Sequence, residues 1–241
     1  MEFRTTRRDF IKAGVVGFCM LTPADLFAKG LFSLQKNEKK ITKNDAPREL
    51  WKWSKEVYYQ RELGQGYVRC LTCPNTCVLP PDARSRCRSH VNKEGKLYTL
   101  VYGNPCAAHI DPIEKKPLYH FLPASATFSI ATTGCSFHCL NCQNWEISQA
   151  RPEDVRFHDL FPEAVIQKVL QTDCKSIAYT YSEATTFYEY MLDTSRLARE
   201  HNIKNVWVTN GYINETPLSE LSKTLDAANV DVKSFSESTY A

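Results

Sequence analysis

The sequence predicts an α/β fold built on a parallel sheet, and the alternation of apolar segments after residue 126 carries that prediction. Short apolar runs alternate with longer stretches whose apolar residues recur at helical spacing. Strands separated by helical patterns of this length are typical of βαβ units. The expected strands are 127–132, 176–181, 205–210 and 230–233, and the expected helices are 162–171, 186–201 and 218–228.

Polar or glycine-containing groups follow each of the first three expected strands. They are Thr133-Gly134-Cys135, Ser182-Glu183 and Asn210-Gly211. Ligands of parallel α/β folds bind outside the carboxyl ends of the strands. The sequence therefore predicts that these groups meet at one edge of the sheet.

The composition suits a globular protein. Of 241 residues, 43% are hydrophobic and 24% are charged, which allows one or two domains with substantial cores. The net charge is only +3, and no dense basic patch interleaved with aromatic residues stands out. Nucleic acid is therefore not an expected partner.

Seven of the ten cysteines fall into two groups. The groups are Cys135, Cys139 and Cys142, and Cys70, Cys73, Cys77 and Cys87. Spacings of two and three residues favour metal ligation over a disulfide framework, because neighbours in a tight loop converge on one site. Disulfides are the alternative.

The group Cys135, Cys139 and Cys142 has the pattern C-x3-C-x2-C and follows an expected strand. Three thiolates can bind three irons of a [4Fe–4S] cluster, whereas four are usual in an electron-transfer cluster. The fourth iron would then be free to chelate a small molecule. A three-cysteine zinc site and buried thiols are the alternatives.

The run from Thr133 to Trp145 resembles the radical SAM superfamily, near the pyruvate formate-lyase activating enzymes. It resembles most the radical SAM members of the AmmeMemoRadiSam system, whose signature includes 111–119 (DPIEKKPLY) and 143–149 (QNWEISQ) as they stand here. The resemblance runs from about Cys70 to the C-terminus. It implies a (βα)6-type barrel, of which this chain would hold only about four strands, so we expect a partial barrel and a truncated product or fragment.

The resemblance implies an enzyme. Its cluster would cleave S-adenosylmethionine (SAM) reductively and generate a 5′-deoxyadenosyl radical. The implied partners are SAM, an electron donor that the sequence does not identify, and a protein that is activated or modified. Because the barrel is expected to be partial, a non-catalytic iron–sulfur or zinc-binding protein, a relic or an electron carrier, is the alternative.

The resemblance also implies residues that bind SAM. Glu183 stands at the position of the Gly-Gly-Glu motif, with Tyr181 and Ser182 in place of the glycines, and would face the methionine ammonium. An ordinary carboxylate at a helix N-terminus is the alternative. Asn210 would bind the ribose or the methionine carboxylate, or belong to a plain Asn-Gly turn.

Asp231 and Lys233 resemble the Asp-x-Lys element of activating enzymes, and alternate residues of a strand point to the same face. We expect both to face the pocket; a solvated edge strand is the alternative. Most members of the superfamily have an aromatic residue before the third cysteine, where this chain has Asn141. Phe137 or Trp145 would supply the apolar surface instead.

The cysteines of the second group, Cys70 to Cys87, resemble the cysteine-rich region that precedes the barrel in this subfamily. Four thiolates would complete a zinc site or a second iron–sulfur cluster. Disulfides are favoured instead if the mature protein lies in an oxidising compartment.

The N-terminus resembles a twin-arginine export signal. Arg7 and Arg8 precede a bulky apolar pair and a short apolar run. The run is too short for a stable membrane span. We expect export to the periplasm, or a cytoplasmic location if the segment is instead an amphipathic helix with a chance arginine pair.

These predictions divide the chain into four parts. The parts are a signal segment at 1–30, a linker with a short helix at 31–65, a cysteine-rich metal-binding domain at 66–122 and an incomplete radical SAM core at 123–241.

Overall fold

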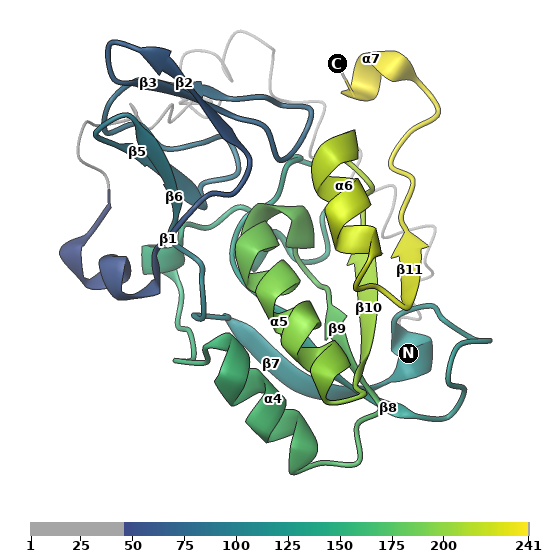
Figure 1. Cartoon of the computed structure of the whole chain (residues 1–241). Helices are drawn as coiled ribbons and strands as arrows, with labels where there is room; N and C mark the ends of the chain where they lie inside the picture. Colours follow the sequence, from purple (N-terminus) through teal and green to yellow (C-terminus); the bar gives the residue numbers. More distant parts are fainter. Residues whose placement is uncertain (1–45, 241) are drawn as a thin grey trace, which may run out of the picture. The chain divides into compact units, whose positions relative to one another are not determined.

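The computed structural model describes residues 46–240 (Figure 1). The expected export signal and residues 31–45 of the expected linker lie outside the described residues. No helix within 46–240 is long and apolar enough to cross a membrane.

A five-stranded sheet forms the centre of the described part, in the order β11-β10-β9-β8-β7. Its strands are β7 (Ala107–Pro112), β8 (Ala126–Ala131), β9 (Ser176–Tyr179), β10 (Lys204–Thr209) and β11 (Ala227–Val230). The strands from β8 to β11 pair in parallel, and β7 pairs antiparallel with β8. The α/β prediction is confirmed.

Helices cover one face of this sheet (Figure 1). They are α4 (Pro162–Leu170), α5 (Tyr188–Glu200) and α6 (Glu215–Ser222). Ile177 and Tyr179 of β9 pack into the core beneath them, whereas Ala178 packs on the opposite face against Ile113. The four residues of β9 are therefore all buried, as is typical of a parallel strand covered on both faces.

Two small antiparallel sheets precede the central sheet, in the orders β1-β6-β5 and β2-β3-β4. Their strands are β1 (Lys55–Glu56), β2 (Gln60–Gly64), β3 (Tyr67–Cys70), β4 (Val78–Leu79), β5 (His90–Lys93) and β6 (Lys96–Thr99). They share a small apolar core around Val68 and Leu97. The remaining short helices are η1 (Arg48–Trp53), η2 (Ile113–Lys115), α3 (Trp145–Ser148), η3 (Pro152–Asp154), η4 (Ala184–Phe187) and α7 (Glu237–Tyr240).

The structure corrects three of the expected elements. The short helix expected within 31–65 is only η1, because the residues that follow it form β1 and β2. Gln65 and Gly66 then adopt positive φ and reverse the chain into β3. The last strand and helix begin three residues earlier than expected. The Asp226 carboxylate accepts the Asn205 amide at 2.9 Å, and this bond sets β11 beside β10 from residue 227.

Strand β7 lies within residues 66–122, which were assigned from sequence to the cysteine-rich domain. It nevertheless pairs with β8 over its whole length, from Ala107 opposite Ala131 to Pro112 opposite Ala126. Residues 107–112 therefore belong structurally to the central sheet.

Candidate functional site

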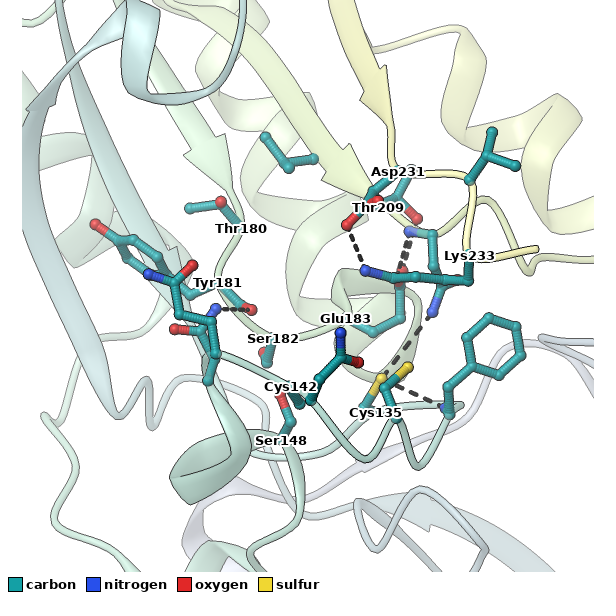
Figure 2. Close-up of a pocket in the computed structure, with 18 of the residues that line it drawn as sticks. Cys135, Cys142, Ser148, Thr180, Tyr181, Ser182, Glu183, Thr209, Asp231 and Lys233 are labelled. Atoms are coloured by element: carbon teal, nitrogen blue, oxygen red, sulfur yellow. Dashed lines mark hydrogen bonds and ion pairs between the residues drawn. The ribbon is translucent and has the colours of Figure 1, made fainter. Parts of the chain in front are cut away.

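A cavity of about 770 Å³ lies beyond the carboxyl ends of the parallel strands (Figure 2). It brings together all seven of the residues expected to bind the cluster and SAM. They are Cys135, Cys139, Cys142, Glu183, Asn210, Asp231 and Lys233. This is the edge of the sheet at which parallel α/β proteins bind their ligands.

The cysteine loop leaves β8 through Gly134, which has φ +105°. A Cβ atom there would lie 2.4 Å from Ser89 Oγ and 2.6 Å from the Cys87 carbonyl oxygen, so the position demands glycine. The Ser89 hydroxyl also donates to the Thr133 carbonyl at 3.0 Å. The first cysteine loop is thus packed directly on the segment that carries the second cysteine group.

Without a bound metal, the surroundings of Cys135 favour its neutral thiol. Burial raises the pKa of Cys135 to about 12, and the nearby Glu183 carboxylate and the other two thiols add to the effect. A bound cation would reverse that shift, because a coordinating thiol is deprotonated outright. Asn210 Nδ2 approaches Cys135 Sγ at 4.0 Å.

Within residues 46–240, no three His, Cys, Asp or Glu side chains converge as ready-made ligands of a single metal ion. A [4Fe–4S] cubane does not require such convergence, since each thiolate binds a different iron. Three thiols spread around one cavity are therefore compatible with a cluster.

Glu183 is buried and fixed in orientation. Its Oε1 accepts the Thr185 amide at 3.0 Å and the hydroxyls of Thr185 and Thr209 at 2.7 and 2.8 Å. Its Oε2 accepts the Asn210 amide at 2.8 Å. Glu183 is also the N-cap residue of η4, which is the role that the alternative interpretation gave it, a carboxylate at a helix N-terminus. It nevertheless lines the cavity as well.

Asn210 is oriented by its own contacts. Its side-chain NH₂ donates to Ser136 Oγ at 3.1 Å, and its side-chain oxygen accepts the Tyr212 amide at 2.9 Å. The second contact is an Asx turn, so Asn210 forms a turn, as the alternative interpretation expected, and also lines the cavity.

Asp231 and Lys233 were expected on the fourth strand, but β11 ends at Val230 and both residues follow it. The Asp231 amide donates to the Thr209 carbonyl at 2.7 Å, and Lys233 Nζ contacts the Asp231 carboxylate. Burial alone would lower the pKa of Lys233, but the contact with Asp231 outweighs it and raises the pKa. The two charges reach the cavity as an ion pair on a loop.

The aromatic residue near the cysteines is Phe137. It lines the cavity and packs on Tyr212, with ring centroids 4.8 Å apart. Trp145 is 61% exposed and does not line the cavity, whereas Asn141 does.

Further residues line the cavity without having been predicted as site residues. Lys115, Lys116 and Asn144 come from the two signature segments, and Tyr181 and Ser182 precede Glu183. The two signature segments marked these residues in the sequence, but a local sequence pattern does not show which side chains reach the cavity.

The second cysteine group surrounds a small enclosed hollow. Cys70, Cys73, Cys77 and Cys87 line it, together with His90. Burial raises the pKa of Cys73 to about 12 and also raises that of Cys70, and the neighbouring thiols reinforce both shifts. Every cysteine that the structure describes is a free thiol.

Residues 129–241 match the family model of the Radical SAM superfamily. The matched residues include the cysteine loop, Glu183 and Asn210. The chain is also similar to the uncharacterized protein MJ0808 of Methanocaldococcus jannaschii, at 43% identity over 179 residues. That similarity covers 74% of this chain and 53% of the relative, so the chain spans about half the length of the curated relative it matches.

Proposed function

We propose that the protein is a radical SAM enzyme that holds a [4Fe–4S] cluster on Cys135, Cys139 and Cys142. The observation that carries the proposal is that these thiols and Glu183 line one cavity at the carboxyl edge of the sheet, inside the matched domain. When bound, the cluster would supply the electron that cleaves SAM and yields the 5′-deoxyadenosyl radical.

The chain's own residues would bind and orient SAM beside the cluster. Glu183 Oε2 accepts one hydrogen bond within the described structure, so it retains an acceptor site for the methionine ammonium. Asn210 presents an amide held in place by Ser136. Phe137 offers an apolar surface for the adenine, and the Asp231–Lys233 pair closes the same cavity.

The activating-enzyme type is the finer part of the proposal. The two signature segments on which the resemblance to the AmmeMemoRadiSam enzymes rests contribute Lys115, Lys116, Gln143, Asn144 and Ser148 to the cavity wall. We propose on this basis that the radical activates or modifies a protein, after an electron donor has reduced the cluster.

Anaerobic reconstitution with iron and sulfide tests the cluster. We expect about four irons per chain, an iron–sulfur absorption band and a change in the electron paramagnetic resonance spectrum when SAM is added. Cys139→Ser should lose the cluster, whereas Cys106→Ser should keep it, because Cys106 lies outside the cavity and contacts the Ala131 carbonyl. Equal behaviour of the two variants would contradict the assignment.

Glu183→Gln tests the SAM site separately. The amide keeps the shape but removes the charge that pairs with an ammonium. We expect the Kd for SAM to rise about tenfold, the equivalent of about 1.4 kcal/mol, with cluster content unchanged. A cluster that forms without any response to SAM would instead favour the non-catalytic iron–sulfur protein.

We further propose that the second cysteine group binds zinc or a second iron–sulfur cluster, on the basis of four buried or half-buried thiols around one hollow. Metal analysis of Cys87→Ser against wild type tests it. We also propose export by the twin-arginine route to the periplasm, supported by Arg7 and Arg8. Arg7→Lys with Arg8→Lys should then retain the protein in the cytoplasm of a host that has the pathway.

A further inference from the structure

Tyr181 has an unusual backbone conformation for its residue type. Its φ is +64°, in the left-handed region that glycine adopts freely and other residues avoid. It lies two residues after the end of β9 and two residues before Glu183, in a segment that lines the cavity from Thr180 to Glu183. A non-glycine residue stays in this region only when its surroundings hold it there.

Two hydrogen bonds hold Tyr181. Its hydroxyl donates to Asp111 Oδ2 on β7, which draws the side chain to the side of the cavity away from Cys135 (Figure 2). Its carbonyl accepts the side-chain NH₂ of Asn144 at 2.8 Å. Asn144 follows the third cysteine by two residues, so the turn is tied to the cysteine loop as well as to β7.

The anchor on β7 is itself fixed. Asp111 and Lys116 are both buried, with Lys116 Nζ 2.7 Å from Asp111 Oδ2. The same ammonium lies 4.4 Å from the centre of the Tyr181 ring, a cation–π distance. Removing one partner of a buried ion pair is costly, so this pair is a rigid attachment point for the tyrosine.

We propose that Tyr181 is a positioning residue for SAM binding. Its side chain, attached to the Asp111–Lys116 pair, holds the left-handed turn that places Ser182 and Glu183 on the cavity wall. The Ser182 hydroxyl completes the turn by donating to the Thr132 carbonyl at 2.6 Å. This inference rests on the proposed function, because it concerns the presentation of Glu183 to SAM.

At residue 181, we expect glycine to support SAM binding better than the larger alanine does. Glycine adopts positive φ without help, whereas alanine at that φ incurs a penalty and lacks the hydroxyl. Tyr181→Gly should therefore bind SAM about fivefold more tightly than Tyr181→Ala, the equivalent of about 1 kcal/mol. Tyr181→Phe keeps the ring but loses the bond to Asp111, and its Kd should rise at least threefold over wild type.

The experiment measures the Kd for SAM on the reconstituted full chain, with iron content determined for each variant. Tyr67→Phe, a partly exposed residue of β3 outside the cavity, is the control for the phenylalanine variant. A weakening of SAM binding from phenylalanine through alanine to glycine would show that the ring acts by packing, and would overturn the inference. Unequal iron content that accounts for the differences would overturn it too.

Failure of the proposed function can be told apart from failure of this inference. If reconstituted wild type does not bind SAM, the proposed function is wrong. The backbone claim is then tested by thermal unfolding, in which Tyr181→Gly should have a higher Tm than Tyr181→Ala. A lower or equal Tm for the glycine variant would contradict the claim that the fold requires positive φ at residue 181.

Discussion

Two neighbouring lysines, one exposed and one buried, contact the Asp111 carboxylate. Replacing each in turn tests how much the buried Asp111–Lys116 ion pair contributes to stability. Lys116 Nζ lies 2.7 Å from Asp111 Oδ2 with its side chain 1% exposed. Lys115 Nζ lies 2.8 Å from Asp111 Oδ1 with its side chain 58% exposed. Methionine approximates the length of lysine without its charge, so each residue can be replaced in turn at similar volume.

The expected magnitudes differ because burial differs. Lys116→Met leaves the buried Asp111 charge with fewer partners, and we expect it to lower the free energy of unfolding by about 3 kcal/mol at pH 7. Lys115→Met removes an exposed contact, worth at most about 1 kcal/mol. Urea unfolding of the full chain measures both, with equal m-values as the check that the folded states are comparable.

The pH dependence of the free energy of unfolding gives a second test of the Asp111–Lys116 pair. Burial alone would raise the pKa of Asp111, but hydrogen bonds from Lys115, Lys116 and Tyr181 outweigh it and lower the pKa. The stability that Asp111 contributes is therefore present above pH 4 and is lost as the pH falls. Without Lys116 the Asp111 pKa should rise, so the deficit of the Lys116 variant should shrink as the pH falls below 4. Equal effects of the two substitutions at pH 7 would refute the reasoning.

Two further substitutions test features outside the lysine pair. Burial raises the pKa of Glu189 to about 7, so the folded state keeps its proton to higher pH than the unfolded state does. Stability should fall by about 3 kcal/mol between pH 4.5 and pH 7, and Glu189→Gln should remove that fall in pH-dependent urea unfolding. Gly134→Ala should destabilise the protein by more than 2 kcal/mol and reduce iron content, because the new Cβ meets the Cys87 carbonyl at 2.6 Å.

Each of these substitutions has a matched control. Glu200→Gln changes an exposed residue at the end of the same helix as Glu189 and should leave the pH profile unchanged. Gly64→Ala incurs the penalty of positive φ but meets nothing within 4 Å. An unaltered pH profile for Glu189→Gln would contradict the first prediction. Equal losses for Gly134→Ala and Gly64→Ala would show that backbone strain, and not contact with the second cysteine group, explains the effect.

The elements that the sequence predicted well are those with strong apolar signals. Strands β8 and β10 begin within one residue of expectation, and α4 begins at Pro162, a favoured first helical residue. The fourth strand was misplaced because Ala227, Ala228 and Asn229 carry little hydrophobic signal. Its position depends instead on a side-chain contact with β10, which no local pattern reveals.

Among the site residues too, those marked by a local pattern could be predicted, and those positioned by tertiary contacts could not. The cysteines, Glu183 and Asn210 could be predicted as site residues from motifs and from positions after strands, which are local properties of the sequence. The Asp111–Lys116–Tyr181 group joins two segments separated by 65 residues or more, and its formation requires that β7 pair with β8. The left-handed backbone of Tyr181 was also hidden, because the residue type argues against it.

The central claim is that this cavity cleaves SAM. Its most direct test is to incubate the reconstituted, reduced protein with SAM under anaerobic conditions and quantify 5′-deoxyadenosine by chromatography. We expect the wild type to form more 5′-deoxyadenosine than cluster-free protein does. Cys139→Ser should form none above that background, and Cys106→Ser should form wild-type amounts. A cluster-loaded wild type that forms no 5′-deoxyadenosine would contradict the claim.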